Sequence, residues 1–338
     1  MLADSQSVLN NQLRKQNLQL IREALHKEQV ATISRLKEVT GLSVVTINKL
    51  IVILLQTGEV YEGEPSYISG GRPAATYRFN AHFKLLLIVT CFQRGGDEYA
   101  GYSVHDLFGE CLERREELLS TGDSIHTDEF RIGIERYIDR YDKIAMIGLS
   151  MPSDSVGGRV GSAIRHDPQS KRLAHHLEQW FKIPVFFETD INAATLGIYK
   201  RSNTEEYVSG IVLVPGRAPA CGFCYSGNVL RGKSGMAGEV RYFPMYNDVP
   251  VLPQETMQAD DLALRTLRAV MCVLNPGLVV VYTENLAPGI ADRLKKKLGT
   301  AAELAMMPKI EVNSQIRDDI VSGMVSLCLE KIDNMHFS

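Results

Sequence analysis

The sequence contains no apolar run long enough to cross a bilayer, although 45% of its 338 residues are hydrophobic. Its first residues, MLADSQSVLNNQLRKQ, have no apolar core of the kind found in secretion signals. Low-complexity segments are absent as well. We therefore expect a globular protein in the cytoplasm with no membrane partner, and the length predicts two or three domains.

Positive charge is also scarce, because 37 lysines and arginines stand against 40 acidic residues and the formal net charge is −3. A basic surface that holds polyanions without selectivity is therefore excluded. Residues 1–80 are the more basic part, with nine lysines and arginines against seven acidic residues. Because this bias is weak, any polyanion bound here would require well-placed contacts and more than one copy of the chain.

Cysteine is not arranged as a disulfide framework. The six cysteines are scattered, mostly in apolar surroundings, which predicts reduced and buried thiols at Cys91, Cys111, Cys221, Cys224, Cys272 and Cys328. The pair Cys221 and Cys224 has the spacing of a redox motif. A thioredoxin-type pair begins a helix, however, whereas this pair leads into a predicted strand, so we expect two structural thiols.

The stretch from Thr32 to Thr57 predicts two short helices joined by a tight turn. Thr32 and Ser43 are suited to cap the two helices, and Gly41 suits a left-handed turn residue. Apolar residues at helical spacing predict the buried faces: Ile33, Leu36 and Val39 in the first helix, and Ile47, Leu50, Ile51 and Leu54 in the second. The outward residues near the start of the second helix are Val44, Val45, Asn48 and Lys49.

This pattern is typical of a helix-turn-helix, whose second helix presents side chains to the major groove of DNA. An ordinary αα-hairpin inside a helical core is the alternative. The next segment favours DNA, because two predicted strands up to Phe79 flank a glycine-rich tip at Ser69–Pro73 and form a wing. Arg72 at this tip can enter a minor groove. The sequence therefore predicts a winged helix-turn-helix with DNA-binding residues Ser43, Val44, Val45, Thr46, Asn48, Lys49 and Arg72.

The rest of the chain predicts two α/β lobes with a cleft between them. A helix over residues 10–26 precedes the winged segment. Strands are expected at residues 84–90, 97–105, 110–117, 144–150, 185–187, 207–214, 222–225, 278–282 and 310–312. Helices are expected at residues 123–142, 173–181, 191–199, 260–274, 290–298 and 316–332. Trp180 lies on an apolar helix face and is expected in the core.

Two later segments carry distinctive motifs: residues 187–194 read FETDINAA, and residues 232–239 read GKSGMAGE. The helix pair has TGLS at its turn, and the wing tip reads GRP. Together these four motifs resemble the repressor branch of the ROK family, and the resemblance covers nearly the whole chain. The ROK family joins sugar kinases to transcriptional repressors of sugar operons. The resemblance implies an α/β protein. A DNA-binding domain over residues 1–80 would precede a two-lobed, actin-like ATPase (ribonuclease-H-like) domain for effector binding and oligomerisation over residues 81–338. Its lobes would cover about residues 81–190 and 191–338.

Three parts of the nucleotide site that the resemblance implies are altered here. In place of D-x-G-G-T after the first strand, residues 89–94 read VTCFQR. The G-x-G-x-G-x-G phosphate loop becomes GRAPACG at residues 216–222, and its Pro219 removes a backbone donor. The late glycine pair is replaced by YTEN at residues 282–285. We therefore expect no ATP-dependent phosphotransferase activity and no catalytic residue.

The zinc site of the family is altered too. It needs a histidine three residues after the A-G-E glutamate, where this chain has Tyr242. It also needs a cysteine cluster downstream, whereas residues 241–253 contain neither Cys nor His. We expect no metal ion and no other cofactor.

Two carboxylates of the sugar site that the resemblance implies are retained, Asp190 and Glu239. In the family's kinases the matching Asp is the general base on the sugar hydroxyl, and the matching Glu contacts the sugar. Together with Asn192, they are the residues expected to bind a hydroxylated ligand here. The alternative is that they only hold loops through hydrogen bonds to the backbone.

The motifs and the resemblance together predict a sequence-specific transcriptional regulator, and more specifically a repressor of carbohydrate-related genes. Its partners would be a double-stranded DNA operator and a small effector, such as a sugar or sugar derivative, in the cleft of a catalytically inactive domain. One helix reads too few base pairs for genomic specificity, so a homodimer or a dimer of dimers on a palindromic site is expected. Two alternatives stay open: a ROK-type carbohydrate kinase, and a DNA-binding scaffold that responds to no ligand.

Overall fold

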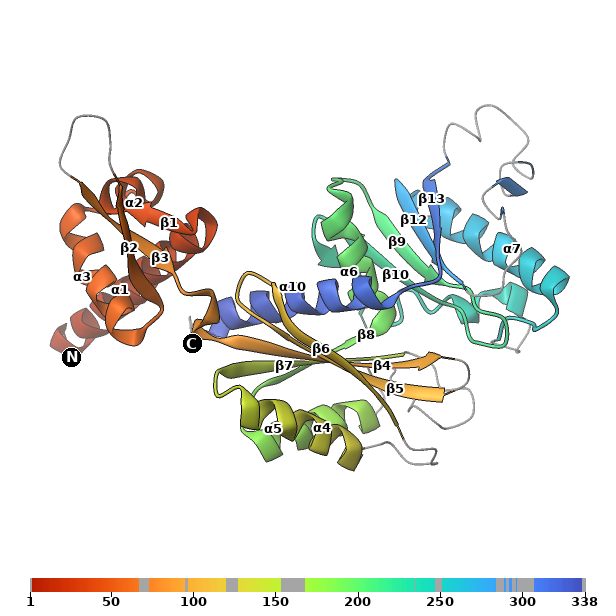
Figure 1. The fold of residues 1–338 in the computed structure, drawn as a ribbon. Coiled ribbons are helices and arrows are strands. Elements are labelled where there is room, and N and C mark those ends of the chain that lie inside the picture. The colour runs from red at the N-terminus through yellow and green to blue at the C-terminus, as the bar shows by residue number, and fades with distance from the viewer. Residues whose placement is uncertain are drawn as a thin grey trace. The chain divides into compact units, whose positions relative to one another are not determined.

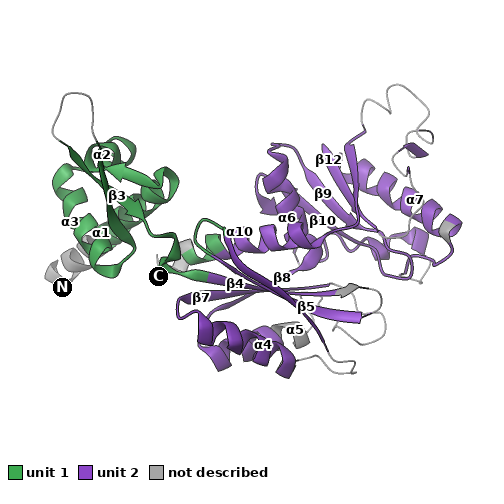
Figure 2. Ribbon diagram, in the orientation of Figure 1, with its two compact units in different colours: residues 1–85, 106–110, 329–338 green, residues 86–105, 111–328 purple. Residues whose placement is uncertain are grey.

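The computed structural model describes residues 2–66, 73–94, 97–119, 127–152, 168–233, 235–246, 251–283, 289, 292–293, 296 and 307–335. The chain divides into two compact units (Figure 2). Unit 1 consists of residues 1–85, 106–110 and 329–338, and unit 2 consists of residues 86–105 and 111–328. Unit 1 is therefore assembled from three separate segments of the chain.

The first segment of unit 1 begins with the helices α1 (Leu2–Glu28), α2 (Ile33–Thr40) and α3 (Val44–Thr57) (Figure 1). The predicted caps of α2 and α3 are confirmed, because Thr32 Oγ1 accepts a hydrogen bond from Arg35 N–H and Ser43 Oγ accepts one from Thr46 N–H. The turn residue Gly41 is left-handed, with φ of 70°, and the axes of α2 and α3 differ by 112°. This angle is that of a helix-turn-helix.

The first helix was predicted from residue 10, which is wrong: α1 begins at Leu2. Its early residues lack apolar periodicity, so the hydrophobic pattern did not reveal them. They also lack glycine and proline, however, and nothing in their backbone preferences interrupts a helix.

A three-stranded antiparallel sheet completes the winged part of unit 1. Its strands are β1 (Val30–Thr32), β2 (Val60–Ser66) and β3 (Ala74–Phe79), in the order β1-β3-β2. The predicted wing hairpin is β2–β3, with Tyr61 opposite Arg78. Strand β1 was missed, because three residues between two helices give no alternating pattern. The wing tip, including Arg72, lies outside the described residues.

The helices of unit 1 bury most of the apolar face that their spacing predicted, and the core includes Ile21, Leu25, Leu36, Ile47, Leu50, Ile51 and Leu54. The expected burial of Val39 is wrong, because 42% of this residue is exposed, and Ile33 is only partly buried. An ion pair joins α1 to the turn after α3, because Arg22 Nη2 donates to the buried Glu59 Oε1 at 2.8 Å. The 106–110 segment is held by Leu107, whose N–H donates to Ala81 O at 3.0 Å and whose carbonyl O lies 2.8 Å from His26 Nε2.

A hollow of about 70 Å³ brings all three segments of unit 1 together. Leu329 and Ile332, from the end of the last helix, form part of its wall. The other lining residues come from α1, the turn after α3, the end of β3, the short helix that follows it and the 106–110 segment: Gln19, Arg22, Glu23, His26, Glu59, Phe79, Phe83 and Leu107. The fold of unit 1 thus uses residues from near both ends of the sequence.

The first sheet of unit 2 has the strand order β6-β5-β4-β7-β8. Its strands are β4 (Leu85–Arg94), β5 (Asp97–His105), β6 (Cys111–Leu118), β7 (Ile144–Met151) and β8 (Val185–Thr189). Helices α4 (Thr127–Arg140) and α5 (Pro168–Phe181) lie on one side and α10 (Arg317–Met335) on the other (Figure 1). A short 3₁₀ helix, η1 (Ala81–Phe83), precedes the sheet.

The expected core position of Trp180 is wrong, because 48% of this residue is exposed. Leu173 and Leu177 fill the buried face of α5. Trp180 lies in the last turn of that helix, where the guanidinium of Arg131 covers its ring at 5.8 Å. A cation on α4, rather than the apolar core, therefore shields the indole.

The second sheet of unit 2 has the order β11-β10-β9-β12-β13. Its strands are β9 (Val208–Val212), β10 (Ala220–Tyr225), β11 (Asn228–Val229), β12 (Leu278–Tyr282) and β13 (Lys309–Asn313). The accompanying helices are α6 (Asp190–Ser202), α7 (Thr256–Leu274), and the 3₁₀ helices η2 (Val240–Tyr242) and η3 (Pro244–Tyr246). Most of the predicted helix 290–298 lies outside the described residues.

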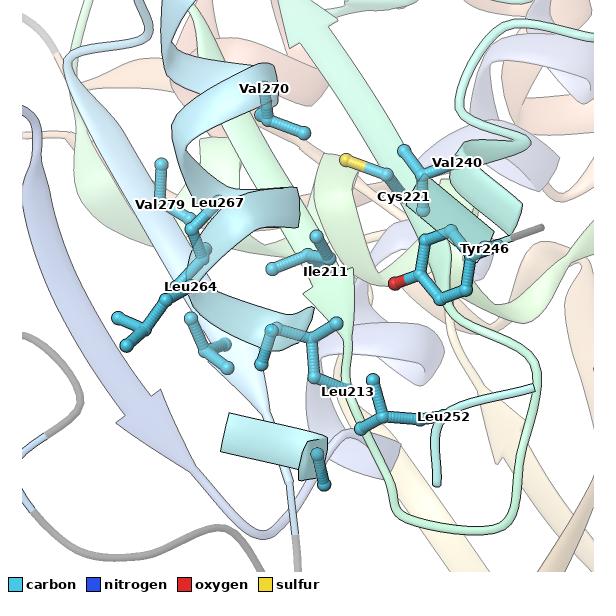
Figure 3. Close-up of a cluster of buried hydrophobic side chains, with 13 residues drawn as sticks. Ile211, Leu213, Cys221, Val240, Tyr246, Leu252, Leu264, Leu267, Val270 and Val279 are labelled. Carbon is cyan, nitrogen blue, oxygen red and sulfur yellow. The ribbon is translucent and has the colours of Figure 1, made fainter. Parts of the chain in front are cut away.

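The core of the second lobe lies between α7 and the central strands of this sheet. Figure 3 shows Leu264 and Leu267 of α7 facing Ile211 of β9 and Val279 of β12. Leu213 and Leu252 extend the cluster to the loops at the ends of the strands (Figure 3). Two α/β lobes were predicted from the alternation of strands and helices, and unit 2 contains both.

Helices α6 and α10 approach each other closely enough that their backbones touch. A Cβ atom on Gly323 would fall far inside contact distance of the carbonyl oxygen of Ala193, and one on Gly197 would do the same to Asp319 O. The contact is reinforced by Asp319, whose Oδ1 accepts from Arg201 Nε at 2.9 Å and whose Oδ2 accepts from Tyr282 Oη at 2.6 Å.

Among the described residues, no individual helix combines the length and apolar composition required to span a membrane. The bent pair of α2 and α3 meets that requirement only when the two are taken together, by length and composition alone.

Candidate nucleic-acid interface and ligand site

The start of α3 presents one exposed face to solvent. Ile47, Leu50, Ile51 and Leu54 are buried, and the side chains between them point outward. Val44 is 43% exposed and Val45 is 65% exposed, while Asn48 and Lys49 are exposed one turn further on. Residues three and four apart are neighbours on a helix, so these four side chains form a single patch.

The hydroxyl groups at the start of α3 are already engaged. Ser43 Oγ lies 2.9 Å from Thr46 Oγ1 and accepts from Thr46 N–H at 3.1 Å. The two hydroxyls therefore hold the helix end in place. The structure brings together six of the seven predicted DNA-binding residues, and the seventh, Arg72, is the one outside the described part.

The predicted ligand residues lie around the N-terminus of α6. Asp190 is the first residue of this helix, and its Oδ1 accepts from Ile191 N–H at 2.6 Å. Asn192 is buried, and its Nδ2 donates to Glu188 Oε1 at 3.0 Å. Glu239 Oε2 lies 2.9 Å from Arg241 Nη2. All three polar groups already have partners, so a bound ligand would have to share or replace them.

A small hollow joins two of these residues. It is lined by Thr189, Ile191, Asn192, Ala220, Cys221, Gly235, Ala237, Gly238 and Glu239. Asn192 and Glu239 thus share one wall, whereas Asp190 is not among the lining residues. The cavity volume is about 10 Å³, which is roughly the room that one water molecule needs. A sugar would require this hollow to open.

The sequence interpretation missed a buried ion pair beside the hollow. Glu188 is fully buried, and its carboxylate accepts from Arg231 Nη2 at 2.7 Å, from Asn192 Nδ2 at 3.0 Å and from Thr189 N–H at 3.1 Å. Glu188 belongs to the FETDINAA segment, which was a signal for it, but nothing in the sequence singles out Arg231. The pair ties strand β8 of the first sheet to the segment after β11 of the second.

At two of the altered nucleotide-loop positions, the backbone groups are used within the protein. Gly216 N–H donates to Leu252 O at 2.7 Å, and Arg217 N–H donates to Val214 O at 3.0 Å. In place of the first loop, β4 continues as a strand, with Val89 opposite Tyr102. The donors that a phosphate loop would aim at a nucleotide are therefore already committed at residues 216 and 217.

Within the described ranges, no group of three or more His, Cys, Asp and Glu side chains could hold a metal ion. Tyr242 stands at the position of the family's zinc-binding histidine and is exposed. The guanidinium carbon of Arg241 lies 5.2 Å from the centre of the Tyr242 ring.

The cysteines of the C-x-x-C motif are buried in strand β10, as expected of structural thiols. Burial raises the pKa of the Cys221 thiol to about 12, although a hydrogen bond with Ser209 opposes the shift. Burial also raises the pKa of the Cys224 thiol to about 11. Because the thiolate is the reactive form, both should be inert well below these pH values.

We predict that iodoacetamide at pH 8 labels the exposed Cys111 and Cys272 in the native protein and leaves Cys221 and Cys224 unmodified. Mass spectrometry of tryptic peptides measures the labelling, and a sample denatured in urea is the control in which all four react. Rapid native labelling of Cys221 would contradict the buried, protonated state.

The geometry can be compared with known proteins. The family model described as ROK family matches residues 91–251, which include both distinctive motifs. The chain carries a ROK family domain. A xylose repressor from Bacillus spizizenii is 24% identical over 239 residues, 68% of this chain. The chain spans only 60% of the length of that repressor.

Solved structures share the fold of the ROK domain and of the segment before it. A ROK family transcriptional regulator, a homologue of the E. coli MLC protein, matches with a TM-score of 0.64 at 15% identity and covers 96% of this chain and 99% of its own. The ROK hexokinase from Thermus thermophilus matches with a TM-score of 0.53 at 17% identity and covers 74% of this chain and 99% of its own. The ROK resemblance and the predicted fold class, a winged helix before two actin-like lobes, are thereby confirmed.

Proposed function

We propose that this protein is a sequence-specific transcriptional regulator that acts as a repressor of carbohydrate-related genes in the cytoplasm. Residues 1–80 would bind operator DNA, and residues 81–338 would bind a small effector and assemble the oligomer. The observation that carries the proposal is the exposed patch at the start of α3. The turn before it has helix-turn-helix geometry and is fixed by Gly41 at the end of α2 and by the Ser43 cap of α3.

The DNA-binding residues of this proposal are those predicted from the sequence. Val44, Val45, Asn48 and Lys49 would face the major groove, Ser43 and Thr46 would order the helix end, and Arg72 would reach the adjacent minor groove. The xylose repressor and the ROK family transcriptional regulator support this function, although their sequence identities to this chain are only 24% and 15%. A homodimer or a dimer of dimers would supply the two half-sites that specificity requires.

The effector would be a sugar or sugar derivative bound by Asp190, Asn192 and Glu239. Because the hollow beside Asn192 has room for about one water, binding would select a state in which this region is more open. An effector can change operator affinity only if its own affinity differs between the two states. Opening of the hollow would provide that difference.

Catalytic inactivity is part of the proposal. The internal bonds of the Gly216 and Arg217 N–H groups support it, since these donors would otherwise hold phosphate. The hexokinase likeness favours the rival, a ROK-type kinase. Release of ADP from ATP in the presence of any hexose, measured with the purified protein, would favour that rival.

We predict that Asn48→Ala and Arg72→Ala each weaken operator binding by about 5- to 150-fold, because one good base contact contributes about 1–3 kcal/mol. Genomic DNA fragments retained by the full-length protein, selected with and without candidate sugars, supply the operator, and fluorescence anisotropy gives the affinity. The melting temperatures should match that of the parent.

The matched controls for these variants are Asn228→Ala and Arg265→Ala, which remove the same side chains from exposed positions in unit 2. They should bind DNA as the parent does. If Asn48→Ala and Arg72→Ala also bound like the parent, the assigned surface would be wrong.

A further inference from the structure

The exposed patch of α3 is unusually apolar for a surface that would meet a polyanion. Val45 is 65% exposed and its neighbour Val44 is 43% exposed, and both lie in the first turn of the helix. Single exposed valines are common on protein surfaces and need no explanation. Two adjacent ones on the face proposed to enter a groove determine which bases that face can accept.

The polar groups beside these valines limit the patch further. The hydroxyls of Ser43 and Thr46 bond to each other at 2.9 Å, so they are committed to the helix cap. Residues 43–49 contain no arginine, the side chain that most often reads guanine. Asn48, one turn after Val44, and Lys49, one turn after Val45, supply the polar groups of the patch.

Only one base offers an apolar group in the major groove. Thymine carries a C5-methyl group there, and adenine, its partner, presents N7 and N6 to a side-chain amide such as that of asparagine. Side chains one helical turn apart are separated by about 5–6 Å, which spans roughly two base-pair steps of about 3.4 Å. Two valines followed by one asparagine therefore match consecutive A·T base pairs.

On the basis of the proposed function, we propose that the patch at the start of α3 reads A·T base pairs. Val44 and Val45 contact the 5-methyl groups of thymine, and Asn48 bonds to adenine in the same half-site. Lys49, at the far side of the patch, contacts a phosphate. The specificity of unit 1 in the major groove then depends mainly on methyl contacts rather than on charged hydrogen bonds.

The test replaces thymine with deoxyuridine, one position at a time, in an operator selected from genomic DNA by the full-length protein. This change removes the 5-methyl group and preserves base pairing. We expect binding to weaken about fourfold for each methyl that a valine contacts, which corresponds to the transfer of about one methylene-sized group. At positions outside the half-site centre, the replacement should have no effect.

Variants link the methyl effect to particular residues. In Val45→Ala, the ratio of the affinity for thymine-containing DNA to that for deoxyuridine-containing DNA should fall to about one at one position of each half-site. The matched control is Val273→Ala, which makes the same change at a 73% exposed position of α7 in unit 2. In this control the roughly fourfold ratio of the two affinities should be unchanged. Melting temperatures verify that both variants fold.

The possible results separate this inference from the proposed function. Tight, selective binding with no sensitivity to deoxyuridine, or a selected half-site of G·C pairs at the contacted positions, would overturn the inference alone. If no fragment bound more tightly than random DNA, the proposed function and the inference would both fail.

Discussion

Gly323→Ala is expected to destabilise unit 2 by roughly 3 kcal/mol, the upper part of the usual range for overpacking. The new methyl group would collide with the backbone carbonyl of Ala193 and with Gly197 N, both on helix α6. Neither atom can move aside by rotating a side chain, so one of the two helices has to shift. Asp319 of α10 bonds to Arg201 of α6 and to Tyr282 of β12, so that shift would loosen these contacts as well.

The sign of this prediction opposes helix propensity. In a helix without tertiary contacts, replacement of glycine by alanine is favourable by about 1 kcal/mol. Ser322→Ala is the matched control, since it alters the preceding, exposed position of α10 and should change stability by no more than a few tenths of a kcal/mol. Urea denaturation followed by circular dichroism measures both. A Gly323→Ala protein as stable as the parent would show that the close approach of α6 and α10 does not exist.

Arg231→Met is expected to cost roughly 3 kcal/mol, because it removes the cation that neutralises the fully buried Glu188 carboxylate. Methionine keeps much of the apolar stem, so the loss reports the charge more than the packing. The remaining bonds from Thr189 N–H and Asn192 Nδ2 cannot neutralise the carboxylate. Part of the loss should return in the double variant with Glu188→Gln, which no longer buries a charge.

Arg265→Met provides the comparison for this ion pair. Arg265 pairs with Asp261 one helical turn away at 2.7 Å, but both side chains are exposed. Exposed pairs of this kind contribute no more than about 0.5 kcal/mol. Thermal denaturation of the three variants and the parent would rank them, and equal losses in Arg231→Met and Arg265→Met would contradict the importance of burial.

The sequence was most informative where structure depends on neighbouring residues. Caps at Thr32 and Ser43 and the turn at Gly41 are local, since each is decided by a residue and the three or four that follow it. Strand β1 is equally local but too short to show a pattern, and the early residues of α1 have no apolar spacing to reveal them. Trp180 shows a different limit, because a helical pattern identifies a face without telling where the core ends along it.

The candidate ligand site was only partly accessible to sequence reasoning. The motifs supplied Asp190, Asn192 and Glu239, yet which hydrogen-bond partners their side chains already hold depends on residues far away in the chain. Arg231 lies 43 positions after Glu188 and belongs to no motif, so the charge balance of this site becomes visible only in three dimensions.

Because unit 1 combines residues from near both ends of the chain, it cannot be completed until synthesis is almost finished. Residues 1–85 leave the ribosome early, but the wall that Leu329 and Ile332 contribute to their shared hollow is synthesised more than two hundred residues later. Until then, Phe79 and Phe83 lack that covering. A nascent chain interrupted before residue 329 would thus carry an incomplete unit 1, and under the proposed function such a truncated product would bind operator DNA poorly.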